Sequence, residues 1–342
     1  MRVAFVGGGT GGHLTPAIGI AEELMSRGHQ VEFWLSGRQV ELNYIDDSIS
    51  HRSLGIDDSA LPRYFSALAS FPRVRKYCRD FKPDLLVSLG GYGGATALAA
   101  LPRPLVCLEG NVVVGKAVRL VSHFAKRVLV MFDKTAVDVP RATVVGPISR
   151  SATALPRREQ ACAKFDLDHQ RPVLLTMGGS QGALSLNQAV IEMLPELKRL
   201  NWQLLCLCGP NKQAAVHEAV EASGVDAAVL EHCSDMGSAY AAADFMLSRG
   251  GASTLAEIWL NQTPTMVMPY MHKDRQQQLN AEQLAPGVQI FDGGEESRRR
   301  LCALLANANM REQMSQSLRE SLVGDGRKIA CDTLEEIVGE KA

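Results

Sequence analysis

The feature that most constrains how this chain folds is a unit that occurs twice: a short apolar run, a glycine-rich turn and an amphipathic stretch. The first copy is VAFV followed by GGGTGGH at residues 3–13, and the second is VLLTM followed by GGSQGA at residues 173–183. Apolar runs of this length that alternate with helical patterns are typical of βα units, which build parallel sheets. The sequence therefore predicts two α/β domains of similar construction.

The other apolar runs fit the same pattern. In the first half, we expect strands at residues 31–35, 85–89, 105–108, 128–131 and 143–145, with helices at 15–27 and 115–126. In the second half, we expect strands at 204–208, 228–230, 245–248 and 266–268, each followed by a turn and a helix. Open α/β sheets bind ligands at the carboxyl ends of their strands, so two such domains predict a ligand cleft between them.

A break in this pattern separates the two halves. Residues 147–172 contain three prolines and many charges, with only a short helical pattern. Such a composition is typical of a linker between domains. We therefore expect a first domain at residues 1–150, a connector at 151–172, a second domain at 173–322, and a C-terminal helix at 323–342 that packs back on the first domain.

Composition and charge exclude several classes of protein. With 46% hydrophobic and 21% charged residues the chain is an ordinary globular protein, and its net charge of −1 creates no field that favours nucleic acid. The eight cysteines are scattered without a C-x-x-C pair, and no histidine joins them at zinc-ligand spacing. The absence of a signal-peptide core at the N-terminus, and of any apolar stretch of 18 residues, predicts a cytoplasmic protein.

The first glycine turn, VGGGTGGHLTPA, exposes backbone N–H groups to an oxygen-rich ligand at the start of a helix. It fits the G-x-G-x-x-G fingerprint of dinucleotide-binding folds, but that interpretation needs an acidic residue at the end of the second strand. Here Glu32 lies near the start of that strand. A P-loop is excluded as well, because His13 and Leu14 stand where it has lysine followed by serine or threonine.

His13 stands at the point where this turn becomes a helix. The ordinary pKa of an imidazole, about 6.5, suits proton removal near neutral pH, so His13 is a candidate general base. The alternative interpretation is a structural histidine whose hydrogen bonds are satisfied, and the position next to exposed backbone favours the base.

The glycine turns of the second half suit a nucleotide. In GGSQGA, backbone N–H groups and Ser180 at the start of a helix suit a diphosphate, although a plain tight turn has the same composition. Within residues 248–281, Glu257 either accepts hydrogen bonds from a ribose diol or simply stabilises its own helix. Gln276 and Gln277 carry the donors and acceptors that sugar hydroxyls need, or else begin a solvated helix.

Two segments mix basic and apolar residues. Residues 61–82 hold six basic side chains and several aromatic ones against a single acid, Asp80. In the helix expected at 115–126, basic residues recur every three or four positions and share one face, from Lys116 to Lys126. Such surfaces suit an anionic membrane, although a solvated helix face has the same composition. The membrane residues predicted here are Arg63, Tyr64, Phe65, Leu68, Phe71, Arg73, Arg75, Lys76, Lys116 and Arg119.

Taken in order, the motifs resemble one family. GGGTGGHLTPA, GGYGG, the EGN at residues 109–111, GGSQGA, GGASTLAEI and PYMHKDRQQQLNA follow one another as they do in the MurG glycosyltransferases, and the likeness covers nearly the whole chain. The resemblance implies an α/β protein of the GT-B type, with two Rossmann-like domains whose parallel sheets face a central cleft. It implies that no divalent metal or other cofactor is required.

The same resemblance implies an activity and its partners. The donor is UDP-N-acetylglucosamine, held mostly by the second domain. The acceptor is lipid I, a lipid-linked muramyl peptide whose C4 hydroxyl receives the sugar with inversion, giving lipid II in peptidoglycan synthesis. The reaction takes place at the inner face of the plasma membrane, so the expected partners include an anionic membrane surface and other cell-wall synthesis proteins.

Site residues follow from the resemblance by motif position. His13 is implied as the base, with Glu109 as its rival or partner, and Gly9 and Tyr92 lie on the acceptor side. The implied donor contacts are Thr10, Gly11, Gly12, Asn111, Arg150, Ser180, Gln181, Gly182, Cys233, Ala252, Ser253, Thr254, Leu255, Glu257, Gln276 and Gln277.

Two motifs depart from the family pattern. This chain has LEGN where the family usually has HEQN, and GPISR where it has GNPVR. Three other functions stay open on the sequence alone. They are a related UDP-sugar transferase that acts on another lipid such as diacylglycerol, a non-catalytic UDP-sugar-binding protein, and an NAD-dependent oxidoreductase.

Overall fold

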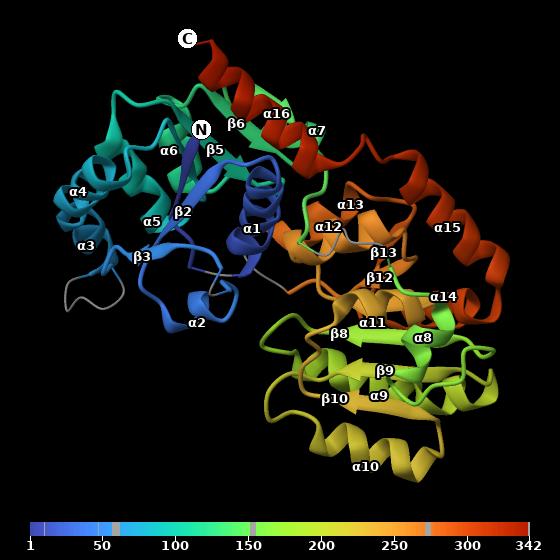
Figure 1. Ribbon diagram of the computed structural model, residues 1–342. Coiled ribbons are helices and arrows are strands. Elements are labelled where there is room, and N and C mark those ends of the chain that lie inside the picture. The colour runs from blue at the N-terminus through green and yellow to red at the C-terminus, as the bar shows by residue number, and fades with distance from the viewer. Residues whose placement is uncertain (10, 47, 57–61, 151–154, 271–274, 341–342) are drawn as a thin grey trace. The chain divides into compact units, whose positions relative to one another are not determined.

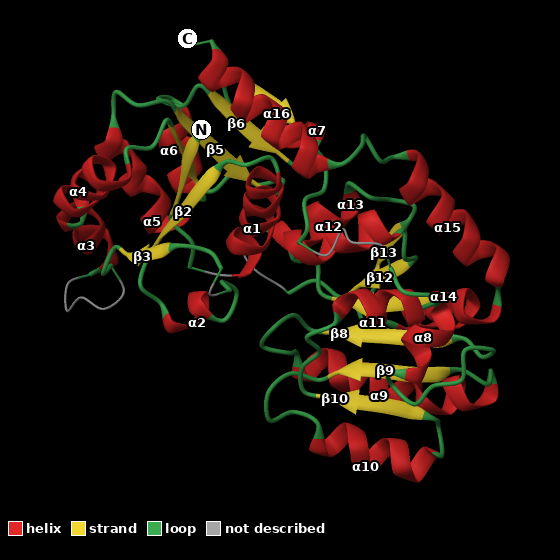
Figure 2. Cartoon of the chain, in the orientation of Figure 1, coloured by secondary structure: helices red, strands yellow, loops and turns green. Residues whose placement is uncertain are grey.

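The computed structural model describes residues 1–9, 11–46, 48–56, 62–150, 155–270 and 275–340 (Figure 1). The chain forms two compact units. The first comprises Met1–Arg150 together with Val323–Ala342, and the second comprises Ser151–Leu322. Each unit is built from a parallel sheet and surrounding helices (Figure 2).

The sheet of the first unit has the strand order β3-β2-β1-β4-β5-β6-β7, and all its pairs are parallel. Its strands are β1 (Arg2–Val6), β2 (Gln30–Leu35), β3 (His51–Ser53), β4 (Leu85–Ser88), β5 (Leu105–Glu109), β6 (Arg127–Val130) and β7 (Ala142–Val144). The order reverses direction between β1 and β4. In open parallel sheets, this switch point is where ligands bind, beyond the carboxyl ends of the strands.

Helices cover both faces of this sheet. They are α1 (Gly11–Ser26), α2 (Gln39–Leu42), α3 (Arg63–Ala69), α4 (Phe71–Phe81), α5 (Gly91–Ala95), the 3-10 helix η1 (Thr96–Ala100), α6 (Lys116–Ser122), α7 (Asp133–Ala136) and α16 (Gly326–Gly339). Side chains alternate along a strand. Val3 and Phe5 of β1 therefore pack into the core under α1 and α16, while Ala4 and Val6 pack into the core under α4 and α6.

Helix α16 belongs to the first unit although it is separated from it in sequence. Arg27 at the end of α1 contacts Asp332 at 2.5 Å and Glu335 at 3.1 Å, and His29 Nε2 lies 2.8 Å from Glu335. The buried Cys331 thiol donates to the Ile20 carbonyl over 3.6 Å. These contacts fasten α16 along α1.

The second unit has one parallel sheet with the order β10-β9-β8-β11-β12-β13. Its strands are β8 (Val173–Met177), β9 (Gln203–Leu207), β10 (Ala227–Leu230), β11 (Phe245–Ser248), β12 (Thr265–Val267) and β13 (Val288–Ile290). Its helices are α8 (Arg158–Ala163), α9 (Leu184–Arg199), α10 (Ala214–Ser223), α11 (Met236–Ala242), α12 (Ala252–Asn261), α13 (Gln276–Glu282), α14 (Glu295–Ala306) and α15 (Ala308–Glu320). The switch point of this sheet lies between β8 and β11.

The segment expected as a connector, residues 151–172, packs on the second unit where the structure describes it. Arg158 of α8 donates to the carbonyl oxygens of His169, Arg171 and Ala242, and its guanidinium lies 2.7 Å from Asp244. Residues 151–154 lie outside the described residues. Arg158 therefore holds α8 against the residues that precede β8 and β11. The linker-like composition of this segment did not indicate that contact.

The expected strands lie within one residue of those in the structure, but several helix boundaries differ. Helix α1 begins at Gly11 rather than residue 15, because Gly7, Gly8 and Gly9 make the turn at positive φ before it. The GGYGG segment, expected as a loop, forms α5. Helix α6 ends at Ser122, so Lys126 is outside the helix and does not share its basic face as expected. The Lys126 backbone N–H donates to the Leu105 carbonyl.

Candidate active site

The two turns at the switch point of the first sheet pack backbone against backbone. A Cβ on Gly7, after β1, would lie 2.5 Å from the Gly94 nitrogen, and a Cβ on Gly93 would lie 2.9 Å from the Gly7 Cα. Real Cβ atoms do not approach other atoms so closely. Gly7 and Gly93 are therefore required for the turns to meet, whatever the turns bind.

His13 is the third residue of α1 and lies half-buried at this switch point. Its Nε2 lies 3.7 Å from the position of a Cβ on Gly90, which follows β4. Burial lowers the pKa of His13 below 6.5, while the charges of Glu109 and Glu41 and a backbone hydrogen bond to Gly8 oppose that shift. The imidazole is therefore neutral at neutral pH, which is the state of a base.

Glu109 ends β5 and is 4% exposed. Its Oε1 accepts hydrogen bonds from the backbone and side-chain nitrogens of Asn111, both over 3.0 Å, and its Oε2 accepts one from the Gly115 nitrogen over 2.9 Å. Three donors thus converge on this carboxylate. Glu109 shapes the turn that leads into α6, and it turns the Asn111 side chain toward itself.

The other residues predicted around the first turn take different positions. The Gly9 carbonyl accepts a hydrogen bond from Arg38 over 2.7 Å, and Tyr92 on α5 is 53% exposed. Arg150, predicted as a donor contact, is engaged within the first unit by Glu22 on α1 over 2.8 Å and by Asp46. Gly11 and Gly12 open α1. Thr10 lies outside the described residues.

In the second unit, the turn after β8 presents GGSQGA to the start of α9. A Cβ on Gly182 would lie 2.1 Å from the Cys208 carbonyl oxygen, because the turn after β9 passes directly beneath it. Ser180 and Gln181 are exposed, and the Gln181 carbonyl accepts from Lys212 over 2.5 Å. The turn therefore offers its outer side to an anion at the N-terminus of a 16-residue helix.

Arg249 follows β11 and was missed by the sequence analysis. Its guanidinium donates to the Ser185 hydroxyl over 2.7 Å and to the Met268 carbonyl over 2.8 Å, and it lies 5.8 Å from the Tyr270 ring centre. Burial lowers the pKa of Arg249. The sequence signal that could have identified Arg249 is its place in SRGG, between a strand and a pair of glycines. A basic residue there places positive charge at the switch point.

Helix α12 begins at Ala252, so Ser253, Thr254 and the buried Leu255 lie in its first turn. Glu257, one turn further, is half-buried and accepts a hydrogen bond from the Tyr240 hydroxyl over 3.0 Å. Burial, reinforced by the Glu257 charge, raises the pKa of Tyr240, so the phenol stays a donor. Tyr240 thus fixes the carboxylate of Glu257.

The glutamines at the start of α13 have different surroundings. Gln277 Oε1 accepts from the backbone nitrogens of Tyr270 over 2.8 Å and Gly250 over 3.3 Å, so its oxygen holds two turns together. Gln276 is half-buried at the first position of the helix. Cys233 is half-buried before α11, and burial raises the pKa of its thiol. Residues 272–274 of the HKDRQQQ motif lie outside the described residues.

The predicted membrane residues divide into two groups. Tyr64, Phe65 and Leu68 of α3 are 62%, 57% and 48% exposed, and they stand beside the exposed Arg63. The exposed Arg75 and Lys76 of α4, and Lys116 and Arg119 of α6, add positive charge. Helix α5 packs against both α3 and α6, and α6 and its C-terminal end add two exposed apolar residues that the sequence analysis missed, Leu120 and Phe124.

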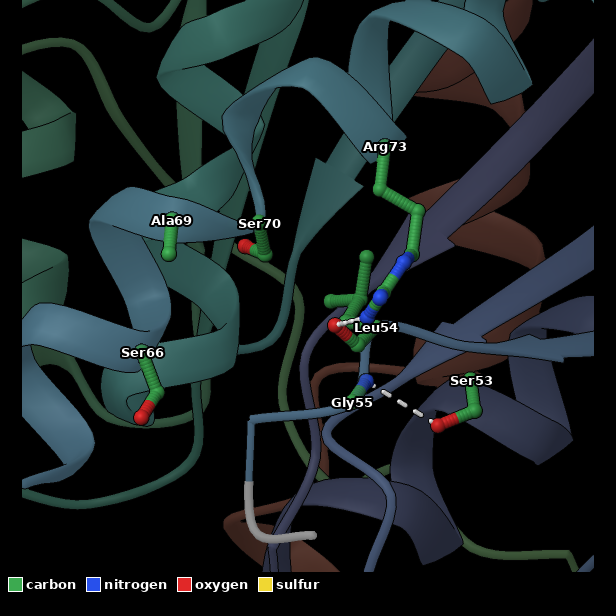
Figure 3. A pocket seen from close by; sticks show the side chains of 7 residues that line it. All are labelled: Ser53, Leu54, Gly55, Ser66, Ala69, Ser70 and Arg73. Atoms are coloured by element: carbon green, nitrogen blue, oxygen red, sulfur yellow. Dashed lines mark hydrogen bonds between the residues drawn. The ribbon is translucent and has the colours of Figure 1, made fainter. Parts of the chain in front are cut away.

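Phe71 and Arg73 have further contacts within the first unit, although Arg73 is exposed. Phe71 is half-buried and packs against the core under α4. Arg73 donates to the Leu54 carbonyl and lies over Gly55, beside a hollow of about 550 Å³ between the segment after β3 and helices α3 and α4 (Figure 3). Serine hydroxyls of this hollow, such as Ser70, donate to helix carbonyls. Arg73 is therefore a tie between α4 and residues 54–55.

Neither a metal-binding cluster nor a membrane-spanning helix is found within the described part of the chain. No group of three or more His, Cys, Asp or Glu side chains there is placed to hold a metal ion. Among the helices of the described ranges, none is long and apolar enough to cross a membrane.

Two α/β units, each with a parallel sheet and glycine turns at its switch point, fit a two-domain glycosyltransferase, and the comparisons with known proteins assign the chain to that class. The family model described as the glycosyltransferase family 28 N-terminal domain matches residues 3–130, and that of the family 28 C-terminal domain matches residues 173–290. The chain therefore belongs to glycosyltransferase family 28 and, within it, to the MurG enzymes.

Relatives support this membership along most of the chain. Proteins named UDP-N-acetylglucosamine–N-acetylmuramyl-(pentapeptide) pyrophosphoryl-undecaprenol N-acetylglucosamine transferase are similar to it in several bacteria. That of Aliivibrio fischeri is 32% identical over 299 residues, covering 83% of this chain and 82% of the relative. That of Acidothermus cellulolyticus is 33% identical over 352 residues, covering 96% and 91%. The predicted MurG resemblance is confirmed, and the oxidoreductase alternative is wrong.

Solved structures confirm the fold class. The crystal structure of MurG from Acinetobacter baumannii has a TM-score of 0.79 at 24% identity, covering 98% of this chain and 99% of that one. The calicheamicin glycosyltransferase CalG4 has a TM-score of 0.66 at 19% identity, covering 100% and 99%. The predicted α/β architecture of the GT-B type, with two Rossmann-like domains, is therefore correct.

Proposed function

We propose that this protein transfers N-acetylglucosamine from UDP-N-acetylglucosamine to the C4 hydroxyl of the muramyl sugar of lipid I, giving lipid II for peptidoglycan synthesis. The observation that carries the proposal is the pair of glycine turns at the two switch points, in a chain 32–33% identical to relatives named for that transfer. A half-buried histidine at the first turn supplies the base that such a transfer needs.

The first unit acts on the acceptor. Neutral His13 takes the proton from the acceptor hydroxyl while the hydroxyl oxygen forms a bond to the anomeric carbon of the donor sugar. The bond from that carbon to the diphosphate oxygen breaks, its electron pair leaves with UDP, and the configuration inverts. Glu109 keeps the turn of residues 110–115 in place and lends its charge to the imidazolium that forms.

The second unit holds the donor. Backbone N–H groups of the GGSQGA turn, the Ser180 hydroxyl and the N-terminus of α9 stabilise the charge that develops on the leaving diphosphate. Arg249 adds a fixed cation at the same switch point. Glu257, held by Tyr240, accepts hydrogen bonds from the ribose diol, and Gln276 reads the sugar hydroxyls at the start of α13.

One assay tests the activity. The purified protein is incubated with UDP-N-acetylglucosamine and a soluble lipid I analogue, and UDP release is measured together with the product mass. Release that requires the muramyl acceptor supports the proposal. Release with diacylglycerol instead would assign another lipid acceptor, and UDP binding without release would identify a UDP-sugar-binding protein.

The exposed surface on α3, α5 and α6 is proposed as the contact with an anionic membrane, where the lipid acceptor resides. Apolar side chains of α3 such as Tyr64 and Phe65 are exposed, as are basic ones of α6 such as Lys116 and Arg119, and α5 packs against both helices. Interfacial binding combines the burial of apolar area with attraction to anionic lipid. Both contributions come from the same surface of the first unit.

Replacing Tyr64, Phe65 and Leu68 together by serine is expected to reduce binding to phosphatidylglycerol vesicles by at least about tenfold, since each buried apolar side chain contributes about 1.5–3 kcal/mol. Vesicle co-sedimentation measures the change. Val137→Ser is the matched control, because Val137 is 85% exposed and follows α7, which is not one of the helices of this surface. Equal binding by the triple variant and the wild-type protein would contradict the proposal.

A further inference from the structure

A buried carboxylate outside the predicted site lies against the first glycine turn. Glu41 of α2 is 0% exposed, and a Cβ placed on Gly8 would lie 2.6 Å from its Oε1. Its Oε1 accepts from the Ser36 hydroxyl over 2.7 Å, and its Oε2 accepts from the Gly37 and Arg38 nitrogens, both over 3.0 Å. The carboxylate thus binds the end of β2 and rests on Gly8.

Arg38 completes the connection between this loop and the turn. Glu41 receives the Arg38 backbone N–H, and the Arg38 side chain donates from Nη1 to the Gly9 carbonyl over 2.7 Å. Two neighbouring peptide units of the turn are therefore touched from the β2–α2 segment, Gly8 by a carboxylate and Gly9 by a guanidinium. Both residues have positive φ, at +148° and +103°. Glycine populates many backbone conformations, so the glycines alone do not select this one.

We propose that Glu41 and Arg38 are positioning residues that hold the glycine turn of residues 7–9, and through it His13, in the geometry that removes the acceptor proton. The inference rests on the proposed function, because it assigns His13 as the base. The GGYGG turn packs against Gly7, and the β2–α2 segment contacts Gly8 and Gly9.

The charge of Glu41 also reaches the imidazole. The charged groups that face His13 are Glu109 from the end of β5 and Glu41 from α2, and both raise the pKa that burial lowers. Arg38 lies on the other side of the turn, at Gly9. Removing the Glu41 charge takes away one of the two opposing carboxylates, so the pKa of His13 falls further below its ordinary value.

Glu41→Gln tests the inference, because the amide keeps the size of the side chain but loses its charge and one acceptor oxygen. We expect kcat to fall about 10- to 100-fold, as misplaced catalytic groups cause, while the Kd for UDP stays within about twofold of the wild-type value. The acid limb of the kcat/KM profile, which reports the loss of neutral His13 as pH falls, should move to lower pH. A purely structural role would not move this limb.

Glu32→Gln is the matched control. Glu32 is a buried carboxylate of the same sheet, 3% exposed, that binds Trp34 and Arg52 instead of the glycine turn. It should lower the melting temperature without moving the pH profile. An unshifted limb in Glu41→Gln, with kcat no lower than in Glu32→Gln, would overturn the inference.

Arg38→Ala provides a second variant if Glu41→Gln does not fold. It leaves the buried carboxylate in place and removes the side-chain contact with Gly9, so we expect a loss of kcat about tenfold without loss of UDP binding. Wild-type kcat in Arg38→Ala would refute its positioning role. Failure of the proposed function itself is distinguishable, because full activity of a His13→Ala variant would remove the base assignment regardless of these two residues.

Discussion

His13→Ala is expected to lower kcat by about 10²- to 10⁴-fold, the usual contribution of a general base, and to leave the Kd for UDP within about twofold. The imidazole lies at the switch point of the first sheet, whereas the turns assigned to the nucleotide belong to the second unit. Removing the imidazole is therefore expected to slow proton transfer without changing the affinity for the donor. Steady-state UDP release and calorimetric UDP binding measure the two quantities.

The control is His51→Ala, because His51 is an exposed histidine on the edge strand β3 of the same unit. The His51→Ala variant should keep the wild-type kcat and the wild-type Kd for UDP. Equal loss of turnover and UDP binding in His13→Ala would remove His13 from the role of base.

The pH dependence of the wild-type enzyme follows from the same residue. Burial lowers the pKa of His13 below 6.5, and only the neutral imidazole accepts a proton. Activity should therefore persist as pH falls through 6.5 and decline only below it. An acid limb with a midpoint above 6.5 would contradict the assignment.

Gly182→Ala is expected to abolish measurable donor binding and to lower the melting temperature. The added Cβ would meet the Cys208 carbonyl at 2.1 Å and the Gly209 Cα at 2.6 Å, both backbone atoms that no side-chain rotation can move aside. The turn must shift, and its N–H groups move off the diphosphate. Each charge-assisted hydrogen bond lost costs about 1.5–3 kcal/mol, or roughly 10- to 100-fold in affinity.

Gly179→Ala, in the same turn, separates the clash from backbone strain. Gly179 also has positive φ, at +80°, but a Cβ there meets nothing within 4 Å. It should cost only the strain of a left-handed residue, about 1–3 kcal/mol. Thermal unfolding and UDP calorimetry on both variants make the comparison, and equal effects would show that packing against the β9 turn is unimportant.

Much of this architecture was predictable because strands are marked by apolar runs. Every expected strand lies within one residue of its place in the structure, and both glycine turns lie where a strand enters a helix. The edge strands β3 and β13 were missed because HRS contains no apolar residue and VQI has only two, separated by Gln289. The start of α1 was misjudged because three glycines complete the turn sooner than typical residues would.

The site was harder to predict, since it depends on contacts between distant segments. Gln277 and Asn111 fit a ligand by composition, yet their side chains hold the turns at residues 250 and 109. Phe71 belongs to a basic, aromatic stretch, but its position on α4 turns it to the core. The role of Glu41 was not predicted, because nothing near it in the sequence indicates that its carboxylate contacts Gly8, 33 positions earlier.

The return of α16 to the first unit has a consequence for synthesis. Ala330, Cys331, Leu334 and Ile337 belong to the same core as α1, but the 172 residues from 151 to 322 are made between them. At about 5–20 residues per second, the ribosome needs roughly 10–35 s to translate that stretch. During this interval the second unit can complete its own core, while the apolar side of α1 remains exposed to solvent. We therefore expect chaperones to bind the nascent first unit.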